Sequence, residues 1–214
     1  GSVIEALSGR FRTVAIDQRG WGQSEAPASG YRMQDLADDA HGVIEALGLE
    51  RYVLVGHSMG GKVAQLLASR RPAGLEAVVL VASSPPSPMV LSPEQKSVMA
   101  GAYTSPESVA WVVDNVLTAT PLAPDVKTRV IEDSLAGAPQ AKQAWPETGM
   151  AEDMTAAVGA IAVPVLVLSG DRDQVDRTDT LKQELLPRIP GAQLKVLPGV
   201  GHLLPLEAPL EVAS

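Results

Sequence analysis

The chain has 214 residues, a formal net charge of −8 and a sequence pI of about 4.9, and this acidic balance argues against binding to nucleic acid or to an anionic membrane surface. It contains no cysteine, which excludes disulfides, cysteine-ligated metals and cysteine nucleophiles. Hydrophobic residues make up 45% and charged residues 20%, which is ordinary for a soluble globular enzyme and favours one domain with an insertion.

Short apolar runs, rich in β-branched residues and bounded by turn residues, predict buried strands of a parallel sheet. These runs are Thr13–Ile16, Tyr52–Gly56, Ala77–Val81, Val163–Ser169 and Gln193–Leu197. Segments with helical periodicity lie between them, at Met33–Leu47, Gly60–Arg70 and Thr178–Leu186. This alternation of strand and helix predicts an α/β fold with a doubly wound, mostly parallel sheet.

The stretch from residue 85 to residue 160 interrupts the alternation, because it contains no convincing strand. It carries helix-like pieces at Pro93–Tyr103, Pro106–Leu117, Asp125–Ala136 and Met150–Ala160. We therefore expect a core in two parts, residues 1–84 and 161–214, with residues 85–160 forming a helical lid over the strand ends, where ligands bind in such sheets. A plain surface subdomain is the alternative.

Ser58 lies in Gly56-His57-Ser58-Met59-Gly60, between a predicted strand and a predicted helix. A strand-to-helix turn this tight is expected to force the serine into a strained conformation and to require very small residues two positions before and after it. The helix that begins there directs its N–H groups toward the serine, so the Met59 N–H is an expected oxyanion donor. A phosphate-binding loop is the alternative, but its glycine spacing does not match.

A nucleophilic serine needs a histidine base and an acid that orients the base. In chains that carry a serine on this kind of strand-to-helix turn, the acid follows the serine and the histidine comes last. His202 follows the last predicted strand on a glycine-rich loop and is the candidate base. Asp173 follows the preceding strand and is the candidate acid, with Asp171 as its main competitor. Asp176 better suits the N-cap of the next helix.

The other two histidines fit minor roles. We expect His57 to pack or to form a hydrogen bond beside the site, and His41 to be solvated on a helix surface. No two of the three histidines have the spacing of metal ligands, so no metal is expected. We see no signal peptide and no transmembrane run, which favours a cytoplasmic location without membrane binding.

These residues resemble the α/β-hydrolase superfamily, most closely its small bacterial branch of esterases, lactonases, cofactor-free haloperoxidases (perhydrolases) and proline iminopeptidases. Asp17–Ser24 is similar to the D-x-R-G-x-G-x-S segment of that branch. The serine turn, Gly170-x-x-Asp173 and Gly201-His202 are similar to its catalytic blocks, and Pro205–Pro209 continues the pattern. The resemblance covers almost the whole chain, except the helical insertion, where such enzymes select their substrates.

The resemblance also implies elements that this chain does not display. Family chains normally begin with three strands and an H-G-type loop that supplies a second oxyanion donor, whereas Val3–Leu7 already resembles the helix that follows them. Without the third strand the sheet would have a gap at its centre. The other end stops inside the last helix, Pro209–Ser214. We therefore expect a fragment that needs a missing N-terminal segment or a complementary chain, and that is unfolded or nearly inactive alone.

The function that the resemblance implies is hydrolysis of a small ester or lactone through an acyl-enzyme, with no metal or organic cofactor. Perhydrolysis and the cleavage of proline amides are alternatives within the enzyme class. A non-catalytic small-molecule receptor built on a hydrolase scaffold is the alternative from another class. The apolar residues of the insertion, including Trp111 and Trp145, suit a small-molecule pocket and equally suit ordinary core packing.

Overall fold

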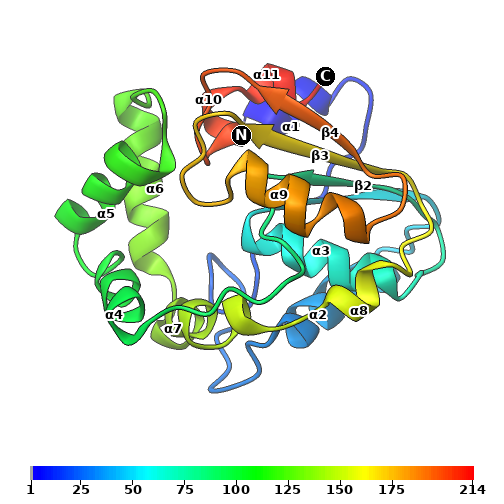
Figure 1. Ribbon diagram of the computed structural model, residues 1–214, viewed down its shortest axis with the longest axis horizontal. Helices are drawn as coiled ribbons and strands as arrows, with labels where there is room; N and C mark the ends of the chain where they lie inside the picture. Colours follow the sequence, from blue (N-terminus) through cyan, green and yellow to red (C-terminus); the bar gives the residue numbers. More distant parts are fainter. Residues whose placement is uncertain (1) are drawn as a thin grey trace.

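The structure, a computed structural model, describes residues 2–214, and the strands of this range form one parallel sheet in the order β1-β2-β3-β4. Their bounds are β1 (Tyr52–His57), β2 (Leu75–Val81), β3 (Val165–Gly170) and β4 (Gln193–Leu197). Because all strands run in the same direction, their carboxyl ends meet at one edge of the sheet. That edge faces the helices of the insertion (Figure 1).

Helices cover both faces of the sheet, which confirms the predicted α/β architecture (Figure 1). One face carries α2 (Met33–Ala46), α3 (Met59–Ser69), α8 (Thr155–Val158) and α9 (Thr178–Glu184), and the other carries α1 (Ser2–Leu7), α10 (Leu204–Glu207) and α11 (Pro209–Val212). A short 3-10 turn, Leu186–Arg188, follows α9. The sequence predicts a longer α2 ending at Leu47, but the helix ends at Ala46 and Leu47 is exposed.

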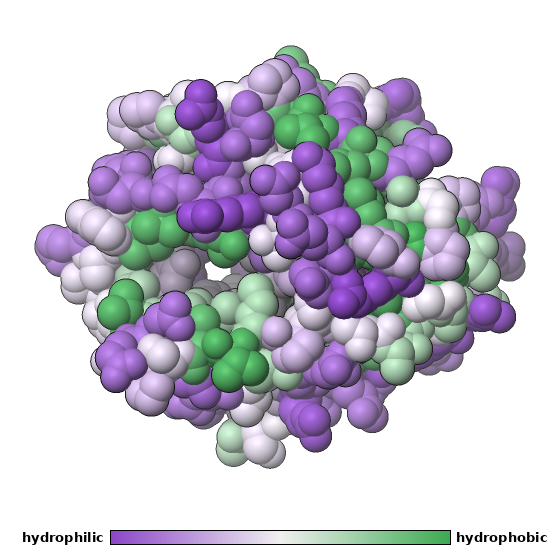
Figure 2. Space-filling view, viewed as in Figure 1, coloured by the Kyte–Doolittle hydropathy of each residue, from purple (hydrophilic) through white to green (hydrophobic). Residues whose placement is uncertain are grey.

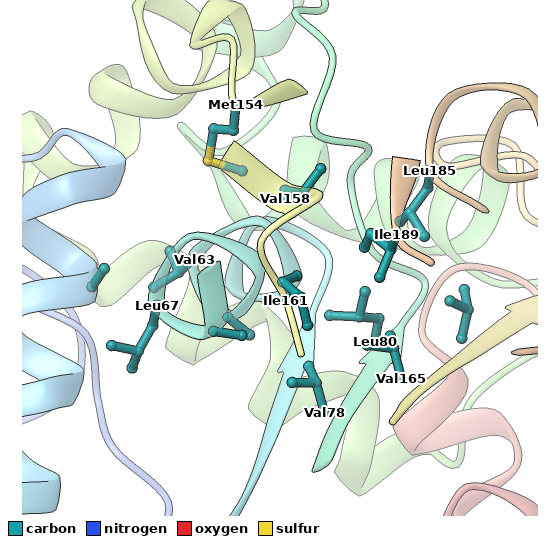
Figure 3. Packing of buried hydrophobic residues seen from close by; sticks show 14 of the residues in the cluster. Val63, Leu67, Val78, Leu80, Met154, Val158, Ile161, Val165, Leu185 and Ile189 are labelled. Atoms are coloured by element: carbon teal, nitrogen blue, oxygen red, sulfur yellow. The ribbon is translucent and has the colours of Figure 1, made fainter. Parts of the chain in front are cut away.

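Alternate residues of β2 and β3 enter two separate hydrophobic clusters, as the period of two in a strand requires. Val78 and Leu80 pack with Val63 and Leu67 of α3 and with residues of α8 and α9, and Figure 3 shows these side chains meeting between the elements. Val81 packs on the opposite face, in a smaller cluster that includes residues of α10. Burial on both faces explains why the strands are apolar without alternation.

The insertion between β2 and β3 is helical throughout its regular part. Besides α8, its helices are α4 (Pro93–Gly101), α5 (Pro106–Val112), a π-helical turn (Val113–Leu117), α6 (Pro124–Ala136), α7 (Pro139–Glu147) and a 3-10 turn (Gly149–Ala151). Ser92 and Ser105 cap α4 and α5, since each side chain accepts a hydrogen bond from the N–H three residues on, and a proline follows each cap. The sequence predicts no helix at α7, whose last turn contains Pro146.

The strand predicted at Thr13–Ile16 does not form, so this prediction is wrong. A strand requires a neighbour for its backbone hydrogen bonds, and within residues 2–214 this segment makes none. Val14 and Ile16 are exposed, as are Val53 and Val55 of β1. All four line one cavity of about 2390 Å³ that separates the segment from the edge of the sheet. The segment is therefore apolar like a strand, but it has no partner strand within residues 2–214.

Between residues 2 and 214, no helix combines the length and the apolar character that crossing a lipid bilayer requires.

Candidate active site

Ser58 occupies the turn between β1 and α3 in a strained backbone conformation, with φ of 51° and ψ of −120°. Its N–H donates to the Val81 carbonyl at 3.0 Å, and its carbonyl accepts from the N–H groups of Gly61 and Ser84 at 2.9 and 3.2 Å. The turn is therefore fixed to the end of the neighbouring strand β2. Strain at this position agrees with the expectation for a serine presented above the sheet.

The glycines around Ser58 differ in how much space they leave. A Cβ on Gly56 would lie 2.3 Å from the Gly60 carbonyl oxygen, and a Cβ on Gly61 would lie 2.2 Å from the Ser83 Oγ. A Cβ on Gly60 would meet only the Gln18 side chain, at 3.7 Å. The expectation that position 60 must be very small is thus wrong, because the crowding falls on positions 56 and 61.

The structure brings Ser58, His202 and Asp173 together in one hydrogen-bonded series. His202 Nε2 lies 2.9 Å from Ser58 Oγ, and His202 Nδ1 lies 2.9 Å from Asp173 Oδ2. The Asp173 side chain is fully buried and that of His202 is 5% exposed. With Nδ1–H donating to the carboxylate, Nε2 has a free lone pair that accepts the Ser58 hydroxyl proton.

Asp173 is held by the backbone that follows it. Its Oδ1 accepts hydrogen bonds from the N–H groups of Val175 and Asp176, at 2.8 and 3.0 Å, so both carboxylate oxygens have partners. The competing acid, Asp171, does not reach His202 in this structure; its Oδ1 accepts from the Gly199 N–H at 2.7 Å. Asp171 therefore joins the turn after β3 to the loop after β4.

The loop that carries His202 is attached to the helical insertion. The N–H groups of His202 and Leu203 both donate to the carbonyl of Leu117, at 2.9 and 3.0 Å, where the π-helical turn ends. Glu207 accepts from Gly201 N–H through Oε2 and from Ala119 N–H through Oε1, at 3.0 and 2.7 Å. Residues of the insertion thus help to set the position of the histidine.

His57 lies behind His202 with the two ring centroids 5.1 Å apart. Its Nε2 is 2.8 Å from the His202 carbonyl oxygen, so Nε2 carries the proton and donates it. Burial, with a smaller contribution from the nearby His202, lowers the pKa of His57 to about 4. His57 is therefore neutral at pH 7, in the hydrogen-bonding role expected beside the site. His41 is partly buried on α2, away from these contacts.

Met59 is the first residue of α3, whose axis begins directly after Ser58. Among residues 2–214, no acceptor takes a hydrogen bond from the Met59 backbone N–H. A free N–H at the start of an 11-residue helix can bind a negative oxygen. This geometry is compatible with the expected oxyanion donor.

A second set of buried polar residues lies beside the site, and the sequence did not predict it. It consists of Lys62, Gln65, Ser83, Ser84 and Asp176, each at most 1% exposed. The prediction that Asp176 caps α9 is wrong: Arg177 is the N-cap residue, and the Asp176 side chain turns inward to Ser84. The only signal in the sequence was the pair of adjacent serines, Ser83 and Ser84, that follows β2.

The molecule has a cavity beside β1 and an opening next to the helical insertion. The cavity of about 2390 Å³ beside β1 extends to His57 and Ser58. Figure 2 shows an opening between the helical insertion and the core, with hydrophobic side chains on its borders. In the described range, histidine and carboxylate side chains form no group of three or more that could hold a metal ion.

The whole chain, residues 1–214, matches the alpha/beta hydrolase family. A 2-(acetamidomethylene)succinate hydrolase of Mesorhizobium japonicum is 30% identical over 208 residues, 92% of this chain and 73% of the relative. A non-heme haloperoxidase of Rhodococcus erythropolis is 29% identical over 214 residues, 90% of this chain and 76% of the relative. The enol-lactonase from Burkholderia xenovorans LB400 superposes with a TM-score of 0.80 at 26% identity, covering 96% of this chain and 79% of that one. The chain belongs to the alpha/beta hydrolase family and is a hydrolase.

Proposed function

We propose that this chain is a serine hydrolase that cleaves small esters or lactones through an acyl-enzyme. The observation that carries the proposal is the hydrogen-bonded series from Ser58 through His202 to Asp173, with both bonds at 2.9 Å. A serine hydroxyl is a weak nucleophile by itself, and a histidine at this distance can take its proton during attack. Its strained turn is typical of such serines.

In the first half of the reaction, Ser58 Oγ forms a bond to the carbonyl carbon and its proton passes to His202 Nε2. The negative charge that develops on the carbonyl oxygen is stabilised by the Met59 N–H and the start of α3. Asp173 stabilises the imidazolium. When the tetrahedral intermediate collapses, the C–O bond to the alcohol breaks, and the departing oxygen takes the proton from Nε2.

In the second half, water attacks the acyl carbon and gives a proton to His202 Nε2. The bond to Ser58 Oγ then breaks, Oγ recovers the proton, and the carboxylic acid product leaves. For a lactone, the alcohol and the acid remain parts of one molecule. Each step uses only a side chain or a backbone N–H of this chain, so the proposed mechanism requires no metal or organic cofactor.

The substrate class is inferred from the surroundings of Ser58 and from the relatives. The opening beside the insertion is bordered by hydrophobic side chains (Figure 2), which favours a small molecule with an apolar part. We infer that residues 85–160 act as a lid over this opening. The enol-lactonase, at 26% identity, supports a cyclic ester as one candidate, and an acyclic ester places the same carbonyl against Ser58.

A fluorophosphonate probe, which reacts with activated serines, tests the proposal. We expect the natural full-length protein to be labelled at Ser58 and its Ser58→Ala variant to remain unlabelled, with its folding verified by circular dichroism. A panel of p-nitrophenyl esters, lactones and proline anilides then identifies the bond that is cleaved. If the folded protein takes up no label and turns over no member of the panel, while binding a small molecule, it is a receptor and the proposal is wrong.

A further inference from the structure

Asp176 is a buried carboxyl next to the site that the proposed mechanism does not use. It is 1% exposed. Its Oδ2 accepts a hydrogen bond from Ser84 Oγ at 3.1 Å, and its Oδ1 has no hydrogen-bond partner among residues 2–214. Burying a carboxyl with one satisfied oxygen is unfavourable, so a purely structural position would be better filled by an apolar or amide side chain. The carboxyl therefore calls for a functional explanation.

Asp176 closes a ring of hydrogen bonds that runs through all three residues of the series. On one side the ring passes from Ser58 Oγ through His202 to Asp173. On the other side, the Asp176 N–H donates to Asp173 Oδ1 at 3.0 Å, Ser84 Oγ donates to the Asp176 carboxyl, and Ser84 N–H donates to the Ser58 carbonyl at 3.2 Å. Ser84 and Asp176 thus connect Ser58 to Asp173 by a second route that does not pass through His202.

Charged groups from three elements face the Asp176 carboxyl. Asp173 lies on the same loop, His202 on the loop after β4, and Lys62 on α3, where its Nζ donates to the Met150 carbonyl. Burial raises the pKa of Asp176 to about 6; His202, the Ser84 hydrogen bond and Lys62 oppose this rise, and Asp173 adds to it. The carboxyl can therefore gain or lose its charge near neutral pH.

We propose that Asp176 is a positioning residue that, in its ionised form, stabilises the imidazolium formed on His202 while its bond to Ser84 holds the Asp173 loop against the Ser58 turn. This inference rests on the proposed function. Asp173 provides the direct contact to the histidine, and Asp176 adds a second negative charge in the same low-dielectric region. An asparagine could keep the bond to Ser84 and would remove only the charge.

The variant that isolates the charge is Asp176→Asn, assayed as kcat/KM against pH with the best ester of the panel. The wild-type protein protonates Asp176 as the pH falls through about 6, so its acidic limb includes this proton in addition to the one that His202 takes up. We expect the variant to have a one-proton limb and a kcat about 10-fold lower on the plateau, with KM little changed. The exposed Asp179→Asn serves as the matched charge control and keeps the wild-type profile.

Ser84→Ala provides a second variant in case Asp176→Asn folds poorly. Removing this donor takes away a hydrogen bond that favours the ionised carboxyl, so the extra protonation step should move to higher pH. An unchanged acidic limb in both variants, measured on folded protein, would overturn the proposal. A fall in activity of equal size at all pH values with an unchanged limb would also overturn it, because that result indicates a structural role only.

A readout without turnover separates this proposal from the proposed function. The imidazole signals of His202 are followed by NMR between about pH 5 and pH 8, assigned with the help of His57→Asn and His41→Asn. In the wild-type protein these signals should respond to the ionisation of Asp176, and Asp176→Asn should remove that response. If the His202 signals respond to the ionisation of Asp176 but no ester is cleaved, the proposed function is wrong and the proposed role of Asp176 toward His202 is supported. If esters are cleaved but the His202 signals do not respond, the proposed function is supported and the role of Asp176 is wrong.

Discussion

The carbonyl of Leu117 accepts hydrogen bonds from the N–H groups of both His202 and Leu203. The π-helical turn that ends at Leu117 therefore holds the loop that carries the proposed base. π-helical turns of this kind are often found at functional sites. The insertion therefore contributes to the position of His202 relative to Ser58. The side chain that strengthens this connection is Glu207, which binds backbone groups on both sides of it.

Glu207→Ala should lower kcat by about 10-fold, because it leaves Gly201 N–H and Ala119 N–H without partners and loosens His202. Glu207→Gln keeps one acceptor oxygen and should fall between the wild type and the alanine variant. Steady-state kinetics with a p-nitrophenyl ester measures both. If the two variants had wild-type kcat, the connection between the insertion and the base would be irrelevant to the reaction.

Asp173→Asn should reduce kcat by about 10³–10⁴, since the amide cannot hold the tautomer of His202 that accepts the serine proton. Asp171→Asn should change kcat by less than about 3-fold, because Asp171 contacts Gly199 N–H and not the histidine. The comparison of the two variants under the same assay decides between the competing acids. The opposite ranking would show that the loop after β3 rearranges and that Asp171 is the functional acid.

Gly56→Ala and Gly60→Ala should have opposite outcomes despite their symmetric positions around Ser58. The Cβ at position 56 would lie 2.3 Å from a backbone oxygen, so we expect a loss of about 3 kcal/mol or more in the free energy of unfolding. At position 60 the contact is ordinary and alanine is the better helix former, so the change should be within about 1 kcal/mol of zero. Chemical denaturation of both variants measures the difference.

If Gly60→Ala lowered the free energy of unfolding as much as Gly56→Ala, the prediction that position 60 accommodates a Cβ would be contradicted. Fluorophosphonate labelling adds a control on the site itself, because Gly60→Ala should keep a reactive Ser58. The motif alone predicts that both glycines are required. The structure distinguishes them, because a Cβ on Gly56 would collide with the Gly60 backbone, whereas a Cβ on Gly60 would make only an ordinary contact with Gln18.

Much of the fold could be predicted because its signals are local. The strands β1 to β4 are short apolar runs between turn residues, and Ser58, Asp173 and His202 each follow a strand at its carboxyl end. Thr13–Ile16 has the same local pattern but no strand beside it within residues 2–214. The local pattern does not show whether a partner strand is present; only the family resemblance predicted a gap in the sheet. Burial and backbone pairing depend on neighbours that are distant in the chain.

The inward turn of Asp176 could not be predicted for a similar reason. Its spacing before α9 suits an N-cap, whereas its actual partner, Ser84, lies 92 positions away in the chain. Lys62 illustrates the same limit: a lysine near the start of a helix normally reaches solvent, yet here it is completely buried. Contacts of this kind come from how strands are ordered in the sheet, which local patterns do not specify.

Lys62→Met should raise the free energy of unfolding at pH 7. Burial lowers the pKa of Lys62 to about 8, while Glu152, Asp153 and Asp176 oppose this shift. The folded state thus binds the Lys62 proton less tightly than the unfolded chain does. The contribution of Lys62 to the free energy of unfolding is therefore highest above about pH 10.5, where Lys62 is neutral in both states, and this contribution is lost as the pH falls through 8. At pH 7 the protein has a protonated amine in its interior, and methionine fills the same space without a charge.

We expect a gain of about 1–2 kcal/mol for Lys62→Met at pH 7, shrinking as the pH approaches 10. The Met150 carbonyl does not lose its last partner, because the Met89 N–H also donates to it at 2.8 Å. Urea denaturation at several pH values measures the gain, with the exposed Lys182→Met as control. A variant less stable than the wild type at pH 7 would mean that the lysine's attraction to the surrounding carboxylates outweighs the unfavourable burial of its charge.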